Sequence, residues 1–391
     1  MPHPNQFRHQ TYCDSLPETS YHVLSGLKPI SPDAVDFHAR VAAACAPFRT
    51  VRLAAVFLVH GTFVGNDALG LLTELRRYWP ELSERLRSAI KGMVDLVVGE
   101  TGNYTAEFAD ALGAGLTAAQ GGVVPVRRFN WSSQNNHIGR ADGAIGLIAE
   151  LATLAESIPA DRFTSDRPPR AMLWGHSHGG NVLAIVTNLL AADAETRQQF
   201  FDAARIFFQR SRESAPDSPA WQQVEQLLAD PEHPVRKLAL EIVTFGTPIR
   251  YGWDTAGYDK LLHFVNHRPT ASLPEYRTGH PLRPRQFWRA VDGDTIHQIG
   301  ISGSNFIPNP LALRTLRADW RLKRLFEHNL AWECLLTKLS RGQRVPEEGL
   351  TLLVDYQDSS WNPTYHLSGH AAYTRREWLP FQLTEIAKVF C

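Results

Sequence analysis

The sequence predicts an α/β protein with a mostly parallel central sheet covered by helices on both faces. Short apolar runs alternate with longer helical segments along the chain, which is the pattern of strand–helix units. The chain has 391 residues, of which 43% are hydrophobic, so it can bury a full-sized core. The strongest apolar run ends in a glycine turn, as a buried strand of a parallel sheet does.

Six short apolar runs are predicted to be strands, and four segments between or after them are predicted to be helices. The predicted strands are 51–60, 123–131, 171–175, 240–245, 261–265 and 350–356. The predicted helices are 68–86 (capped by Asp67), 136–158, 181–192 and 376–390. We expect the strands to lie side by side, with ligands bound at their carboxyl ends.

The chain is expected to form one large domain. Residues 1–50 are proline-rich and weakly patterned, and we expect an N-terminal extension packed on the core. Residues 51–390 are expected to form the domain itself, with insertions at about 91–122, 193–239 and 299–345. Such inserted segments can cover a site at the carboxyl ends of the strands.

Charge and cysteine content exclude several protein classes. The chain has 40 Lys+Arg and 40 Asp+Glu, and this zero formal net charge argues against nucleic-acid binding. The four cysteines are far apart, which argues against a disulfide-stapled fold or a cysteine-rich zinc site. No signal peptide and no membrane-spanning stretch is recognised, so we expect a cytoplasmic protein. Signal-independent export and the oligomeric state stay open.

The pattern Gly175-His176-Ser177-His178-Gly179 lies between a predicted strand and a predicted helix. A serine in such a tight turn needs glycine two positions to either side, because a Cβ there would collide with backbone. The turn directs the Ser177 hydroxyl out of the sheet and places the His178 amide where it can donate to an oxyanion. The alternative is a glycine-rich turn that packs a helix closely on a strand.

The pattern His60-Gly61-Thr62-Phe63 directly follows the first predicted strand. Gly61 allows a sharp turn, and the Thr62 amide is the candidate second donor to the same oxyanion. We expect His60 to be structural, hydrogen-bonded beneath this loop. The alternative is an ordinary turn at the end of a strand.

These two motifs in this order, with Phe245-Gly246-Thr247-Pro248 after a later strand, resemble the lipase/esterase branch of the α/β-hydrolase superfamily. The resemblance covers roughly residues 51–390, although its specific motifs occupy only short parts of that range. It implies an α/β-hydrolase fold with helical cap insertions. It also implies a catalytic triad of Ser, Asp or Glu, and His in that chain order, with the acid after a late strand and the His after the last one.

Two histidines lie beyond the last predicted strand, His366 and His370, and the order implied by the resemblance makes either the candidate base. We favour His370, because Gly369 gives its loop freedom to approach the serine. The small residues Ala371 and Ala372 leave room for a substrate. His366 is the alternative.

The acid has four candidates. Asp294 follows a tight glycine turn and precedes a short segment with apolar residues, which resembles the acid loop of the family. We rank Asp292 second, then Asp254 and Asp355. An Asp-Gly-Asp sequence is also common in simple turns.

We therefore expect a serine hydrolase that cleaves carboxylic esters, lipids among them, without a metal or organic cofactor. A thioesterase and a non-catalytic binding protein of the same fold are alternatives. A metallohydrolase is a further alternative because His176 and His178 form a His-x-His pair. The corresponding metal motif needs Asp and His where this chain has Gly180 and Asn181. Acyl length and head group cannot be inferred from these residues.

Residues 311–339 form a segment with apolar residues at helical spacing and a basic polar side. The apolar positions are Leu313, Leu316, Trp320, Leu322, Phe326, Leu330, Leu335, Leu336 and Leu339. The basic residues are Arg314, Arg317, Arg321, Lys323 and Arg324. One interpretation is a cap helix packed on the core with a solvated charged face, and the other is a cap over Ser177 that contacts an anionic membrane surface.

Overall fold

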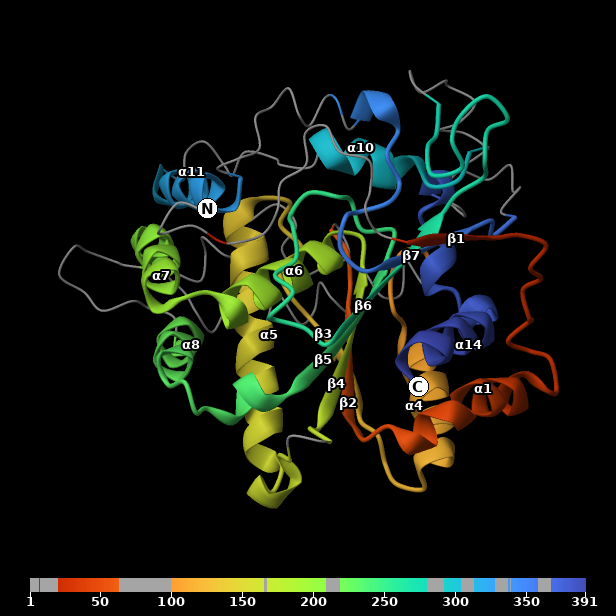
Figure 1. Cartoon of the computed structure of the whole chain (residues 1–391), viewed down its shortest axis with the longest axis horizontal. Coiled ribbons are helices and arrows are strands. Elements are labelled where there is room, and N and C mark those ends of the chain that lie inside the picture. The colour runs from red at the N-terminus through yellow and green to blue at the C-terminus, as the bar shows by residue number, and fades with distance from the viewer. Residues whose placement is uncertain are drawn as a thin grey trace.

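The computed structural model contains a seven-stranded sheet in which every pair of neighbouring strands is parallel (Figure 1). The structure describes residues 7, 20–62, 100–164, 167–208, 219–279, 292–303, 313–327, 337, 339–357 and 367–391. The strands are β1 (Tyr21–Leu24), β2 (Leu53–Val59), β3 (Val126–Phe129), β4 (Arg170–His176), β5 (Ala239–Phe245), β6 (Lys260–Asn266) and β7 (Leu350–Val354). Their order across the sheet is β1-β7-β6-β5-β4-β2-β3.

All six predicted strands are confirmed, as β2 to β7. The seventh strand, β1, was not predicted because it lies in the weakly patterned N-terminal part of the chain. It pairs only with β7, at the edge of the sheet. The predicted helices 136–158, 181–192 and 376–390 are confirmed, whereas 68–86 and its cap Asp67 lie outside the described residues.

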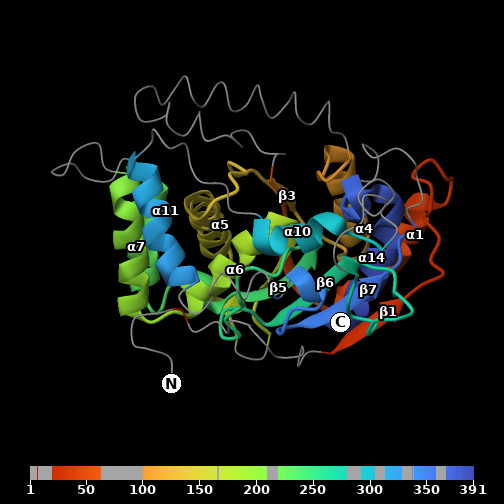
Figure 2. The same cartoon turned by 90° about the horizontal axis from the view of Figure 1, so that it is seen from above.

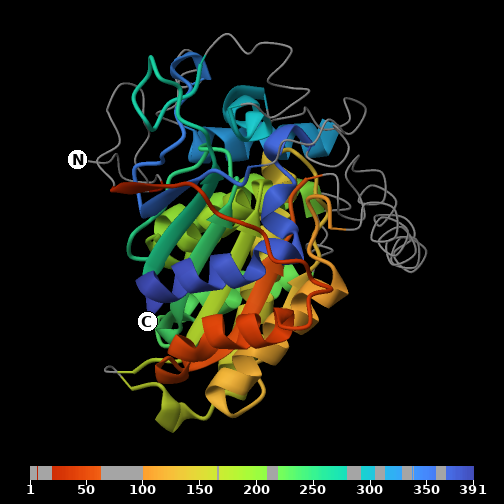
Figure 3. The same ribbon diagram turned by 90° about the vertical axis from the view of Figure 1, so that its right-hand side faces the viewer.

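Helices cover both faces of the sheet. One face carries α1 (Phe37–Cys45), α4 (Ala106–Gln120) and α14 (Leu379–Phe390), which Figure 3 shows in front of the strands. The other face carries α5 (His137–Ser157) and α6 (His178–Ala191). Outside these lie α7 (Ala194–Phe208), α8 (Pro219–Ala229) and α11 (Leu313–Phe326), as Figure 1 shows, and Figure 2 shows α7 and α11 from above. The helix α10 (Thr295–Gly303) lies over the carboxyl ends of the strands (Figure 1).

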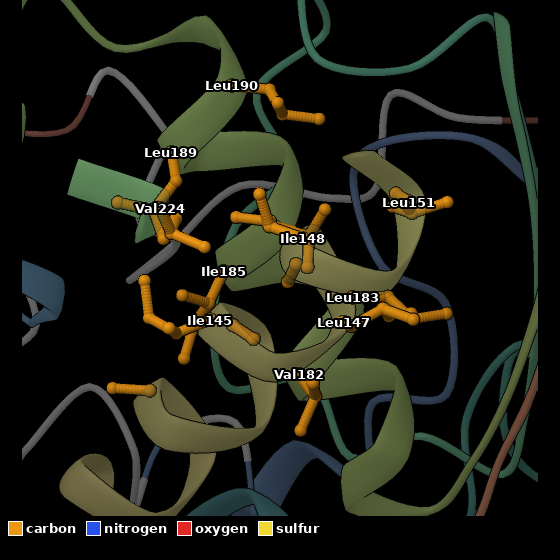
Figure 4. Close-up of a cluster of buried hydrophobic side chains, with 14 of the residues drawn as sticks. Ile145, Leu147, Ile148, Leu151, Val182, Leu183, Ile185, Leu189, Leu190 and Val224 are labelled. Carbon is orange, nitrogen blue, oxygen red and sulfur yellow. The ribbon is translucent and has the colours of Figure 1, made fainter. Parts of the chain in front are cut away.

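The strands divide their apolar side chains between two cores, one on each side of the sheet. In β2, Phe57 and Val59 face the core with α5 and α6, whereas Val56 and Leu58 face the core with α1, α4 and α14. Burial on both faces explains why these strands are continuous apolar runs in the sequence. Figure 4 shows leucine, isoleucine and valine side chains of α5 and α6 interlocking in the first core.

The strand order reverses beside β2. The chain runs from β2 to β3 at the sheet edge and then returns to form β4 on the other side of β2. In open α/β sheets, ligands bind at the carboxyl ends of the strands where the order reverses. The loop after β2 and the turn after β4 meet there, so both predicted oxyanion segments lie at this place.

Shorter elements complete the described chain. The 3-10 turns are η1 (Ala46–Thr50), η2 (Ala160–Arg162), η3 (Pro234–Lys237), η4 (Leu367–Gly369), η5 (Ala372–Thr374) and η6 (Arg376–Trp378). The range 193–239 contains α7, α8 and η3, and the range 299–345 contains α11. None of the helices that the structure describes is long and apolar enough to cross a bilayer.

Several histidines are buried and have pKa values below the ordinary value. These buried histidines are His137, His176, His178, His263, His267 and His297. In β6, the His263 Nε2–H donates to the Glu348 carbonyl (3.1 Å), and Nδ1 accepts from the Thr244 hydroxyl (2.6 Å). Burial lowers the pKa of His263 to about 4, so the ring is neutral at pH 7.

We predict that the free energy of unfolding falls as the pH is lowered from about 6.5 to about 4. In this range the unfolded histidines bind protons that the folded protein excludes, at up to about 1.4 kcal/mol per pH unit for each histidine. Urea unfolding at a series of pH values measures this slope. His263→Gln should make it shallower by about one proton, and the same change at exposed His22 should not. An unchanged slope in His263→Gln would contradict the prediction.

Candidate active site

Ser177 occupies a strained turn between β4 and α6. Its φ of 53° and ψ of −132° lie in a region that residues other than glycine rarely adopt. Its amide donates to the Phe245 carbonyl (2.9 Å), and its carbonyl accepts from the Thr247 hydroxyl (2.9 Å) and the Gly180 amide (3.0 Å). The segment after β5 therefore holds the turn, and this gives a structural role to the sequence Phe245-Gly246-Thr247-Pro248.

The glycines on either side of Ser177 are required by space, as expected. A Cβ added to Gly175 would lie 2.7 Å from backbone atoms of Gly180. One added to Gly179 would lie 2.5 Å from the Val59 carbonyl oxygen. These contacts are too short for carbon atoms, so α6 can begin this close to β2 and β4 only with glycine at both positions.

The loop after β2 lies directly against Ser177. A Cβ added to Gly61 would be 2.7 Å from the Ser177 Cβ. The Gly61 carbonyl accepts from His60 Nδ1–H (3.0 Å) and from the Ser133 hydroxyl (2.7 Å). His60 thus supports the loop by hydrogen bonds, and the half-buried Thr62 follows immediately.

His178 is the first residue of α6, where the helix dipole favours negative charge near the backbone amides. Its ring is held from inside the protein, because Nδ1 accepts from Asn181 Nδ2 (2.9 Å) and lies 3.4 Å from Arg140 Nη1. Burial and the neighbouring Arg140 keep the pKa of His178 well below its ordinary value. The ring is therefore neutral, with its proton on Nε2.

Asp294 and His370 form a buried hydrogen-bonded pair. His370 Nδ1 lies 2.7 Å from Asp294 Oδ2, and the His297 amide donates to Oδ1 (2.8 Å). Burial raises the pKa of Asp294, but the charge and hydrogen bond of His370 outweigh it and lower the value to about 2. The ionised carboxylate keeps a proton on Nδ1 and leaves His370 Nε2 as a proton acceptor. That Nε2 atom is buried and makes no hydrogen bond.

Asn266, the last residue of β6, forms hydrogen bonds with Asp294 and with Gly369, the residue before His370. The Asp294 amide donates to the Asn266 carbonyl (2.8 Å), and Asn266 Nδ2 donates to the Gly369 carbonyl (2.8 Å). Arg344, which is buried, donates to the Asp294 carbonyl. Tertiary contacts thus join residues that lie about a hundred positions apart in the chain.

The neighbours of Ser177 contact this pair. The ring of His176 lies 4.6 Å from the ring of His370, and His176 Nε2 lies 3.1 Å from the His370 carbonyl. A Cβ added to Gly246 would lie 2.7 Å from Asp294 Oδ2. No hydrogen bond joins the Ser177 hydroxyl to His370 within the part of the chain that the structure describes.

The other acid candidates lie in different surroundings. Asp254 Oδ1 accepts from the backbone amide two residues later, that of Ala256 (3.0 Å). Asp355 forms an ion pair with Arg268 (2.7 Å). The carbonyl of Asp292 accepts from the Arg268 amide (3.4 Å). His366, the alternative base, lies outside the described residues.

The His176 and His178 rings do not converge on one point. The first points to the His370 carbonyl and the second to Asn181, so their nitrogen atoms serve separate hydrogen bonds. In the described ranges, no group of three or more His, Cys, Asp or Glu side chains could hold a metal ion.

Tyr373 is a site residue that the sequence analysis missed. Its hydroxyl accepts from the Asn266 amide (2.7 Å), so its single hydrogen is donated to Asp294 Oδ2 (2.8 Å). The side chain is fully buried, and burial keeps the pKa of its phenol well above the ordinary value. The only sequence signal is its position three residues after His370, within the same short loop.

We predict that Tyr373→Phe lowers the free energy of unfolding by about 2–3 kcal/mol, because the Asn266 amide and the Asp294 carboxylate each lose a buried partner. Denaturant unfolding measures the change. Tyr104→Phe is the matched control, since its buried hydroxyl makes no hydrogen bond. That variant should not lower stability, because it removes a buried hydroxyl that has no hydrogen bond to any residue the structure describes. Equal costs for the two variants would contradict the prediction.

Comparison with known proteins identifies no relative. No family model, no curated protein and no solved structure matches this chain. Function is therefore inferred from the geometry of Ser177, Asp294 and His370.

Proposed function

We propose that this chain is a serine hydrolase of the α/β-hydrolase type that cleaves carboxylic esters through an acyl-enzyme on Ser177. One observation carries the proposal: a buried, hydrogen-bonded Asp294–His370 pair lies against His176, the residue directly before a serine held at positive φ. The two features come from distant parts of the chain: Ser177 follows β4, beside the reversal of strand order, and the pair is held at the end of β6. The chain order Ser177, Asp294, His370 is also the order of the triad in the lipase/esterase branch.

The proposed reaction uses each of these groups in turn. Nε2 of His370 takes the Ser177 proton as the hydroxyl oxygen attacks the ester carbonyl, and Asp294 stabilises the resulting imidazolium. The alcohol leaves with that proton, which gives the acyl-enzyme. Water then attacks the acyl group, again with His370 as base, and the carboxylic acid is released.

Backbone amides of Thr62 and His178 are the proposed oxyanion donors. Gly61 lies within contact distance of Ser177. His178, the residue after Ser177, is the first residue of α6. Both segments therefore lie next to the serine whose hydroxyl reacts in this proposal. Each such donor typically contributes about 3–4 kcal/mol to the stabilisation of the transition state. The neutral ring of His178 and the hydrogen bonds of His60 hold these two segments in place.

The buried Nε2 of His370 favours a catalyst over a non-catalytic binding protein. Asp294 orients the ring through Nδ1 and leaves Nε2 as the proton acceptor, an arrangement that a general base needs and a binding site does not. A thioesterase would use the same groups and is the alternative substrate class. Hydrolysis rates for oxygen esters and thioesters of increasing acyl length distinguish the two classes.

The test is labelling of the full chain with a fluorophosphonate, which reacts covalently with activated serines. We expect labelling of Ser177 and its loss in Ser177→Ala. His370→Ala and Asp294→Asn should lower the labelling rate by about 10³- to 10⁴-fold, because the serine loses its base or the base loses its orientation.

The matched controls are His366→Ala and Asp292→Asn, which change the alternative base and acid. Both should keep labelling close to that of the unsubstituted protein. An unlabelled protein that is folded, or labelling that survives Ser177→Ala, would exclude the proposed mechanism. Loss of labelling in a control would reassign the base or the acid.

A further inference from the structure

The helix α11 buries only part of the apolar set that its sequence predicts. Its buried residues are Thr315, Ala318, Asp319, Leu322 and Phe326. Leu313 and Trp320, which belong to the apolar spacing of the sequence, are 72% and 58% exposed. Asp319 fixes this orientation, because its Oδ1 accepts from the Ile138 amide (3.0 Å) in the first turn of α5.

The outward face of α11 combines these two apolar side chains with positive charge. We use the term "α11 face" for Leu313, Arg314, Arg317, Trp320, Lys323 and Arg324, all of which are exposed. The single acidic residue of the helix, Asp319, is buried on the other side. The Arg324 guanidinium lies over the Trp320 ring, 5.2 Å from its centroid, so cation and aromatic ring form one surface.

We propose that the α11 face docks on an anionic lipid membrane. A helix with tryptophan and leucine among arginine and lysine residues can place its apolar side chains between lipid head groups while its cations contact the anionic ones. Each cation close to such a surface strengthens partitioning by roughly fivefold. Trp320 also has the amphipathic ring that is favoured at membrane interfaces.

Contacts at its carboxyl end hold the helix α11 against the rest of the protein. Glu327, directly after α11, pairs with Arg250 (2.5 Å), and the ring of Phe326 lies 5.2 Å from the ring of Tyr251. The helix therefore does not need to fold when it binds, which removes one cost of association.

The neighbouring helix does not cancel this charge. α11 lies beside α7 (Figure 2), which carries the exposed acidic residues Glu195 and Asp202. Asp202 forms an ion pair with Arg205 of its own helix (3.2 Å), and the two exposed acids of α7 are fewer than the four exposed cations of the α11 face. The proposal is independent of the proposed hydrolase chemistry.

The experiment is flotation of the full chain, carrying Ser177→Ala to prevent hydrolysis, with two kinds of vesicle. One kind is pure phosphatidylcholine, and the other contains added phosphatidylserine. We expect binding to the anionic vesicles only, and we expect it to weaken as salt is added. The double variant Arg317→Gln with Arg324→Gln should weaken binding by about 25-fold. Trp320→Ser should also weaken it, while its circular dichroism stays unchanged.

The matched controls flank α1 in the chain, and α1 lies on the opposite side of the sheet from α11 (Figures 1 and 2). Lys28→Gln with Arg49→Gln removes the same charge, and Val35→Ser removes an exposed apolar side chain. These controls should leave binding unchanged. The proposal is overturned if anionic vesicles do not bind the protein, if both kinds of vesicle bind it equally, or if the controls weaken binding as much as the α11 variants. Each of these results leaves the fluorophosphonate test of Ser177 unaffected.

Discussion

The buried carboxylate of Asp294 is the interaction on which the rest of the site depends. It is closed off from water and stays ionised because donors surround it: His370 and Tyr373 at Oδ2, and the His297 amide at Oδ1. A buried charge is stable only when it is paired and hydrogen-bonded in this way. The donors belong to α10 and to the loop after β7, so the carboxylate joins two elements over the end of the sheet.

A second constraint is the lack of space around Ser177. Strand β4 ends in contact with the loop after β2, and the start of α6 is pressed against both of them. The positive φ of Ser177 stores strain of roughly 1–3 kcal/mol, which must be supplied by the surrounding hydrogen bonds. Those bonds come from Phe245, the last residue of β5, and from Thr247 shortly after it. The ends of three adjacent strands, β2, β4 and β5, therefore hold Ser177 in place.

The buried Asp294 carboxylate and the close packing around Ser177 place the residues of the proposed chemistry at one end of the sheet. The proposed site lies at the carboxyl ends of the strands, where ligands bind in open α/β sheets. Figures 1 and 3 show α10, which begins directly after Asp294, at the same end of the molecule as α11. The helix α11 therefore lies at the same end of the molecule as the proposed site.

The sequence by itself determined the parallel sheet, the six strands from β2 to β7 and the glycine-flanked turn at Ser177. These features are local: an apolar run needs burial on both faces, and a serine turn needs glycine two positions away on each side. The sequence could rank Asp294 above Asp292, Asp254 and Asp355, but their distances from His370 depend on contacts between residues far apart in the chain. The edge strand β1 was not predicted, because its residues show no clear periodicity in the sequence. Its place in the sheet comes from backbone pairing with β7.

Only the tertiary structure decided which polar groups share the site and which face of α11 is exposed. Tyr373 became a partner of Asp294 because Asn266 fixes the direction of its hydroxyl, a contact across about a hundred residues. In α11, Asp319 accepts from the Ile138 amide at the start of α5 on the same buried side as Leu322 and Phe326, while Leu313 and Trp320 are exposed. Helical periodicity gives the residues on each face of a helix, but the neighbouring elements decide which face is buried.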